Sequence, residues 1–82
     1  MATVRYHGRL AELTGCREES LDGANVSKVL DQIKKRHGAE AGKLAKRSHI
    51  LVDKRSAGAE KGFRTPVGVD STVEFIPVCG GG

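Results

Sequence analysis

The sequence is poor in aromatic residues, with one tyrosine, two phenylalanines and no tryptophan among 82 residues. Aliphatic side chains must therefore fill most of any core, and a chain of this length has room for one small domain. The scarcity of aromatics also argues against a surface that stacks nucleic-acid bases, although the formal net charge is +4. We expect a solvated surface with a mild basic bias and no nucleic-acid partner.

Cysteines and long apolar runs are also scarce. The two cysteines, Cys16 and Cys79, lack the spacing of a metal site or of a disulfide framework, so we expect free thiols. No apolar run approaches the roughly 20 residues that a membrane helix needs, and residues 1–6 lack the layout of a signal peptide. These absences predict a soluble, cytoplasmic protein that has no membrane partner.

Patterns that would indicate catalysis or metal binding are missing as well. The three histidines, His7, His37 and His49, lie far apart in the sequence, without the short spacing of a zinc site. His37 is explained by the last turn of a predicted helix, where positive charge suits the helix dipole. No serine can be assigned to a nucleophile–base–acid set. We therefore expect no bound metal or cofactor, and no free-standing enzyme.

The first part of the chain predicts two strands joined by a loop. Val4 and Tyr6 alternate with polar neighbours, which is typical of a half-buried strand over residues 2–7. A single helical turn around residues 10–13 follows. The next strand is expected over residues 16–21, and its first residue, a cysteine, is interpreted as a small structural hydrophobe.

The clearest helix begins after Asn25, a good N-cap, and stops at Gly38. Apolar residues recur at helical spacing along one face and are expected to pack on a sheet. They are Val26, Val29, Leu30 and Ile33.

Two further strands and a weak strand or loop are expected after this helix. Residues 39–47 are polar and basic, so we expect an irregular segment with Leu44 tucked against the core. Residues 50–52 form a short apolar run typical of a buried strand, and a weak strand or loop follows through residues 57–59. The last strand is expected over residues 72–78. This order predicts an α+β roll, with one main helix across a mixed sheet of four to five strands.

Several segments resemble one known family. Residues Val4–Gly15 are similar to the start of molybdopterin synthase small subunits, and Thr65–Val67 and Val73–Pro77 resemble the segments that lead to a terminal diglycine. The chain thus resembles the ubiquitin-like β-grasp sulfur carriers, although its triple-glycine end is closer to the thiamin-type members. The resemblance implies a β-grasp domain over residues 1–77 and a flexible glycine tail over residues 78–82.

The resemblance also implies a chemistry for the tail. The carboxylate of Gly82 would be adenylated by an ATP-dependent partner related to ubiquitin-activating enzymes. A sulfur-donating enzyme would then supply the sulfur of a thiocarboxylate, which passes sulfide to a pterin precursor in the large subunit of molybdopterin synthase. Glycine has no Cβ, so it suits a narrow channel. A tail of five residues reaches roughly 17 Å. Its inserted residues would be Val78, Cys79, Gly80 and Gly81.

Three points about the tail stay open. The reactive terminus is Gly82 if strand parity is kept, or Gly81 if the segment is aligned on its proline. Cys79 is either a thiol that reacts with the thiocarboxylate or simply a small residue. Partner docking is assigned to Phe75, Ile76 and Pro77, where parity turns Phe75 toward the core and Ile76 outward.

Other functions are compatible with the same residues. The carrier could serve thiamin synthesis or tRNA thiolation, or the chain could be a ubiquitin-like modifier joined to lysines. From a different class, the domain could be a basic interaction module whose glycines are a frayed end. The order of strands and helix favours the reactive tail.

Overall fold

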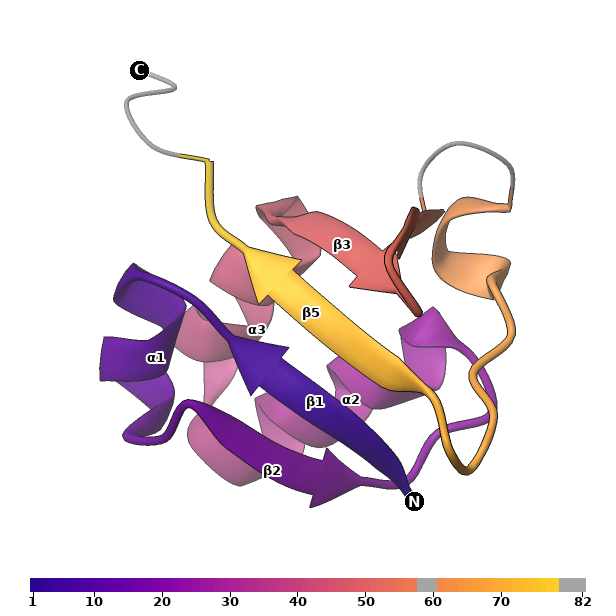
Figure 1. Ribbon diagram of the computed structural model, residues 1–82. Helices are drawn as coiled ribbons and strands as arrows, with labels where there is room; N and C mark the ends of the chain where they lie inside the picture. The colour runs from indigo at the N-terminus through magenta and orange to yellow at the C-terminus, as the bar shows by residue number, and fades with distance from the viewer. Residues whose placement is uncertain (58–60, 79–82) are drawn as a thin grey trace.

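The computed structural model describes residues 1–57 and 61–78. Five strands form one sheet in the order β2-β1-β5-β3-β4, and helices α2 and α3 cover one of its faces (Figure 1). The strands are β1 (Ala2–Tyr6), β2 (Glu18–Leu21), β3 (His49–Val52), β4 (Arg55–Ser56) and β5 (Thr72–Ile76). The helices are α1 (Arg9–Thr14), α2 (Val26–His37), α3 (Ala39–Arg47) and the short 3-10 helix η2 (Gly62–Arg64).

The first and last strands lie side by side in the sheet. β1 pairs with β5 in parallel, while β1–β2, β3–β4 and β3–β5 are antiparallel. This mixed sheet with helices on one face is the ubiquitin-like β-grasp arrangement, so the predicted fold class is confirmed. None of the described helices is long and apolar enough to span a membrane.

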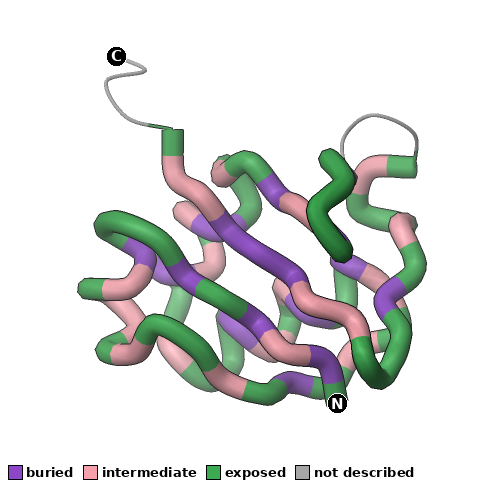
Figure 2. The backbone as a smooth tube through the Cα atoms, in the orientation of Figure 1, coloured by how far each residue is buried: buried purple, intermediate pink, exposed green. Residues whose placement is uncertain are grey.

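The core lies between the sheet and α2. Val4 and Tyr6 of β1 and Val73 and Phe75 of β5 belong to the buried core, and Figure 2 shows buried positions along both strands. The predicted stripe of α2 meets them, since Val26, Val29 and Ile33 are fully buried and Leu30 packs against them from the edge. Asn25 caps this helix as predicted, because its side chain accepts a hydrogen bond of 2.9 Å from the Lys28 amide.

The prediction of an irregular segment over residues 39–47 is wrong, because these residues form α3. The face of α3 that meets the core consists mainly of alanines: Ala41 and Ala45 are buried, and Leu44 is packed against them. Alanine is the best helix former and lets the two helices approach closely. A Cβ on Gly42 would lie 3.0 Å from Lys34 Cβ.

Several strands have other bounds than predicted. β2 begins only at Glu18; before it, the Thr14 hydroxyl lies 3.0 Å from the Cys16 carbonyl oxygen in a local turn. β5 ends at Ile76 and not at residue 78, because Pro77 has no N–H to donate to a neighbouring strand. The weak strand or loop predicted through residues 57–59 does not coincide with a strand at its described residue: β4 covers Arg55–Ser56, Ala57 follows it, and residues 58–60 lie outside the described part of the chain.

Candidate functional site at the end of β5

The predicted tail begins where the most buried strand of the sheet ends. Val73, Glu74 and Phe75 are all buried, whereas Pro77 is half-buried and Val78 has 68% of its surface exposed. The chain therefore passes from the rigid centre of the sheet to solvent within three residues. The remaining predicted tail residues lie outside the described part of the chain. These are Cys79, Gly80, Gly81 and Gly82.

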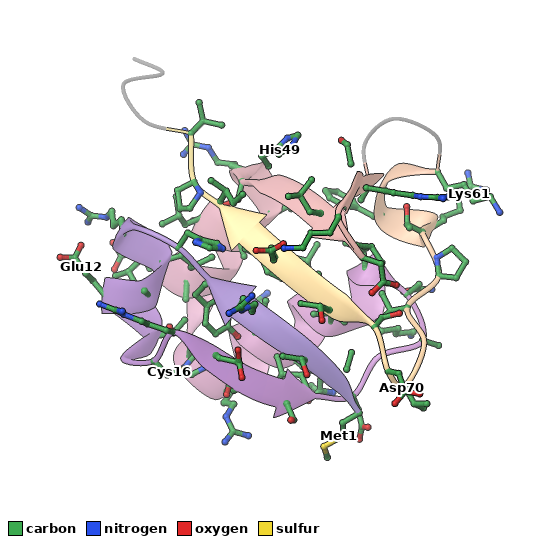
Figure 3. All side chains as sticks on the ribbon, in the orientation of Figure 1. Met1, Glu12, Cys16, His49, Lys61 and Asp70 are labelled. Carbon is green, nitrogen blue, oxygen red and sulfur yellow. The ribbon has the colours of Figure 1, made fainter. Side chains whose placement is uncertain are left out.

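The residues predicted to dock a partner differ in burial and in the face of the sheet on which they lie. Phe75 is fully buried and its ring centroid lies 6.2 Å from that of Tyr6, so it belongs to the core and offers no surface to a partner. This corrects its assignment to docking and confirms the parity argument. Ile76 is half-buried on the open face, where it pairs with His49 of β3. Figure 3 shows His49 beside the end of β5.

A charged cluster occupies the centre of the open face. Glu74 is only 7% exposed, and its carboxylate lies 3.2 Å from His7 Nε2 and 3.5 Å from Lys54 Nζ. Burial opposes ionisation, but the hydrogen bond from His7 and the charge of Lys54 outweigh it and hold the pKa of Glu74 below its usual value. Lys54 reaches this place from a tight β3–β4 turn, in which Asp53 and Lys54 both have positive φ.

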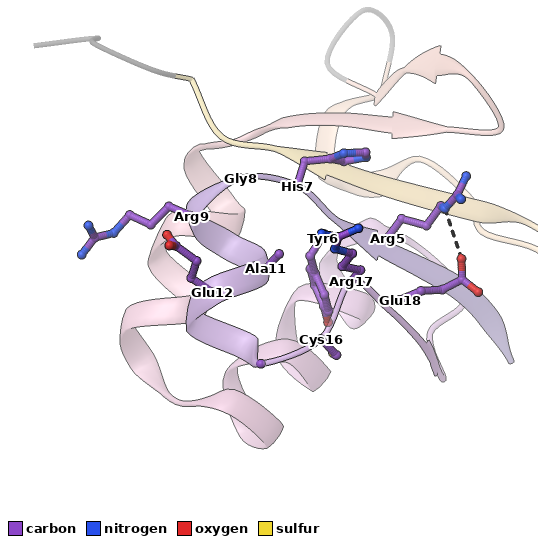
Figure 4. Close-up of a pocket in the computed structure, with 11 residues that line it drawn as sticks. Arg5, Tyr6, His7, Gly8, Arg9, Ala11, Glu12, Cys16, Arg17 and Glu18 are labelled. Atoms are coloured by element: carbon purple, nitrogen blue, oxygen red, sulfur yellow. Dashed lines mark ion pairs between the residues drawn. The ribbon is translucent and has the colours of Figure 1, made fainter.

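A surface depression of about 950 Å³ lies beside the end of β1, between β1, α1 and β2 (Figure 4). Three arginines line it, one from β1, one from α1 and one from the segment before β2: Arg5, Arg9 and Arg17. Arg5 forms an ion pair of 3.2 Å with Glu18, and Arg9 forms one of 3.7 Å with Glu40. Because Tyr6 at the end of β1 pairs with Phe75, this depression adjoins the base of the tail.

A second cluster lies inside the sheet–helix layer, close to the depression. Glu19 of β2 accepts a hydrogen bond of 2.5 Å from the Tyr6 hydroxyl and contacts His37 Nε2 at 2.6 Å and Arg36 Nε at 2.9 Å. Cys16, a free thiol, has its sulfur near the same groups. Burial and the hydrogen bond to Glu19 raise the pKa of the Tyr6 hydroxyl.

Sequence reasoning missed this second cluster. Its members come from β1, β2, α2 and the loop before β2, so no local spacing connects them. The one available signal was strand parity: Glu19 occupies the same inward-facing side of its strand as Leu21. A carboxylate at an inward position needs polar partners.

Comparison with known proteins agrees with the fold. The sequence model of the ThiS family matches residues 4–82. The small archaeal modifier protein 1 of Methanosarcina acetivorans superposes with a TM-score of 0.85 at 20% identity, over 99% of this chain and 95% of that one. CysO in the BexX/CysO complex of Amycolatopsis orientalis gives 0.84 at 24% identity, over the whole of both chains.

A third similar structure comes from Pyrococcus furiosus. It is a candidate molybdopterin converting factor, subunit 1, with a TM-score of 0.73 and 25% identity over 93% of this chain and 94% of that one. No match was found among curated protein sequences. The family match covers nearly the entire sequence, and the β-grasp fold agrees with it. The chain therefore belongs to the ThiS family of ubiquitin-like sulfur carriers.

Proposed function

We propose that the protein carries sulfur as a thiocarboxylate on Gly82 and acts as the small subunit of a molybdopterin synthase in the cytoplasm. The observation that carries this proposal is the junction at the end of β5. A buried central strand leads directly to an exposed Val78 and a run of glycines. The buried strand fixes the start of the tail. The glycines, which have no Cβ, keep the tail narrow enough to enter a channel of a partner protein.

The chemistry follows from the weak electrophilicity of a carboxylate. The terminal carboxylate attacks the α-phosphate of ATP in an activating enzyme related to those of ubiquitin, and pyrophosphate leaves. Sulfide, delivered by a sulfur-donating enzyme, then adds to the acyl carbon, and AMP leaves with the bonding electron pair. The product is a thiocarboxylate whose sulfur is nucleophilic. After this sulfur bonds to the acceptor, water cleaves the acyl–sulfur bond, which leaves the sulfur on the acceptor and restores the carboxylate.

The carrier in this scheme is a co-substrate. The ionisable group nearest the middle of β5, Glu74, is held in ion pairs with His7 and Lys54 on the open face. The partner enzymes would supply the catalytic groups. The tail would carry the terminal carboxyl group into their active sites, and its residues would be Val78, Cys79, Gly80 and Gly81. The half-buried Ile76 and Pro77 beside it are suited to partner contact.

The choice of a pterin acceptor has narrower support. The Pyrococcus furiosus neighbour, at 25% identity, is described as a candidate molybdopterin converting factor subunit. The segment over residues 4–15 resembles the same branch. Both observations favour a larger synthase subunit as the partner that receives the tail.

Intact-mass measurement tests the proposal. The full chain is incubated with the activating enzyme, ATP and a sulfide source, and we expect a gain equal to the replacement of one oxygen by sulfur. Omission of ATP should abolish the gain, and so should deletion of Gly82. A gain that survives the deletion would assign the reaction to another residue, and no gain with an active enzyme would contradict the carrier function.

A second measurement tests the acceptor. The thiocarboxylated chain is mixed with a molybdopterin synthase large subunit and the pterin precursor, and sulfur transfer is followed by the return of the original mass. Lysine-linked conjugates in cell extract, without transfer to the pterin, would instead identify a protein modifier.

A further inference from the structure

We propose that Cys16, Glu19 and His37 form a binding site for a divalent metal ion of the zinc class. Each residue offers one ligand atom, and these three atoms lie within 4.8 Å of one another. The three residues are assembled from separate elements: Cys16 precedes β2, Glu19 lies in β2, and His37 is the last residue of α2. The site is separate from the tail residues that the proposed sulfur chemistry uses.

The ligand set fits zinc in kind. A thiolate and an imidazole are ligands that favour zinc and cobalt over magnesium or calcium, which prefer oxygen. One thiolate and one carboxylate offset the two positive charges of the ion, and the further positive charge of Arg36, which pairs with Glu19, is on a side chain that is 63% exposed to solvent. The charge balance matters because the side chains of Glu19 and His37 are each only 12% exposed, and an unbalanced charge is costly in such a place.

The geometry requires small movements of side chains. Tetrahedral zinc places its sulfur, nitrogen and oxygen ligands roughly 3.3–3.6 Å apart. His37 Nε2 and Glu19 Oε2 are now 2.6 Å apart, so the ion would separate them by about 0.7 Å to reach that spacing. The three ligand atoms lie within 4.8 Å of one another, so the Cys16 sulfur would have to move by about 1 Å to reach the same spacing.

The surrounding groups already orient the carboxylate as outer-shell groups do in metal sites. Tyr6 donates to Glu19 Oε2 and Arg36 Nε lies 2.9 Å from Oε1, so the carboxylate is fixed from two sides. An ion placed between His37 Nε2 and Glu19 Oε2 leaves both of these supporting contacts in place. The structure thus offers three ligands and an ordered support for one of them.

The ion has a route to the site. Cys16 and Tyr6 line the surface depression between β1, α1 and β2 (Figure 4), so solvent reaches the sulfur from that side. A water molecule from the depression would complete the fourth position. Binding forms metal–sulfur, metal–nitrogen and metal–oxygen bonds, and it releases the thiol proton and waters of the hydrated ion, while the imidazole of His37 keeps its one N–H on Nδ1. Affinity should therefore fall as the pH is lowered.

Cobalt titration of the full, metal-free chain tests the site. Co²⁺ is added to reduced protein while the thiolate-to-cobalt charge-transfer band and the visible bands of tetrahedral Co²⁺ are recorded. We expect one equivalent to bind with both signals, and Zn²⁺ to displace it. Cys16→Ser should abolish the charge-transfer band, while the matched variant Cys79→Ser, which removes the other thiol, should retain it.

Two further variants separate a metal site from a purely structural cluster. His37→Gln should remove tetrahedral binding, and Tyr6→Phe, which keeps the ring but removes one support of the carboxylate, should weaken Co²⁺ binding by about 10–100-fold. Circular dichroism confirms that each variant is folded. Absence of a charge-transfer band in the unaltered chain, or a band that survives Cys16→Ser and disappears in Cys79→Ser, would overturn the proposal. Neither result bears on thiocarboxylate formation, which the mass measurement tests separately.

Discussion

Glu19 is the residue on which three side chains from two other elements converge. Tyr6, Arg36 and His37 all reach its carboxylate. Burial opposes ionisation of Glu19, but the hydrogen bonds from Tyr6 and His37 and the charges of His37 and Arg36 outweigh it. The pKa of Glu19 is therefore held below its ordinary value of 4.5. The folded protein binds this proton more weakly than the unfolded chain does.

This lowered pKa predicts how stability depends on pH. The stabilisation from Glu19 is complete above pH 4.5, the ordinary value, and is lost as the pH falls through the lower value of the folded state. Glu19→Gln should cost about 1–3 kcal/mol in the free energy of unfolding at neutral pH, because it weakens a charged, hydrogen-bonded network. The difference from the unaltered chain should shrink in acid.

Urea unfolding at several pH values, with a chelator present to exclude metal, measures this difference. The exposed Glu12→Gln removes the same charge without disturbing an ion pair in the described part of the chain, so it should leave stability nearly unchanged. An equal loss for Glu19→Gln at neutral and acid pH would show that the network stabilises the fold without its charge.

At the scale of elements, the loop before α2 approaches the helix closely at Gly23. A Cβ at this position would lie 2.7 Å from Val29 Cγ2 and 2.8 Å from the Val29 amide nitrogen. One of these is a backbone atom, so the loop or the helix must shift. We expect Gly23→Ala to destabilise the protein by about 1–3 kcal/mol, as overpacking does.

Thermal unfolding compares this variant with Gly68→Ala. At Gly68 the added Cβ would meet only Ser71 Oγ at an ordinary 3.4 Å, so the melting temperature should change little. If both variants have the same melting temperature as the unaltered chain, the loop and the helix do not approach each other closely at Gly23 in solution.

The helices and strands differ in how well the sequence predicts them. α2 was predicted at both ends because its cap, apolar stripe and terminal glycine all agree, and the buried side of β5 followed from the alternation of Val73 and Phe75. α3 was missed because Ala41 and Ala45 carry too little apolar surface to stand out among lysines. Their burial becomes evident only when α2 lies beside them. The Glu19 cluster was missed for the same reason, because its contacts are set by packing between distant elements.

At the scale of the molecule, we expect two neighbouring residues of β5 to have different effects, one on the stability of the fold and the other on binding to a partner. Phe75 is fully buried whereas Ile76 lies half-buried on the open face. Phe75→Ala should cost about 3–5 kcal/mol. That is a large part of the roughly 4–12 kcal/mol expected for a domain of this size. Ile76→Ala should cost less stability and weaken binding to the activating enzyme or to the synthase subunit.

Chemical unfolding and calorimetric titration with the partner measure the two effects on the same pair of variants. Ile76→Ala that binds as tightly as the unaltered chain would remove this residue from the docking surface. Phe75→Ala that stays as stable as the unaltered chain would contradict its place in the core.

The parallel pairing of β1 with β5 has a consequence for biosynthesis. Thr3 pairs with Thr72, so the centre of the sheet joins segments from opposite ends of the described chain. Contacts this distant in sequence form late and slow folding. A ribosome-bound chain that still lacks β5 has no partner for the inner edge of β1 or of β3. The sheet can close only when β5 has emerged, so its central pairing forms only after nearly all of the described chain has been synthesised.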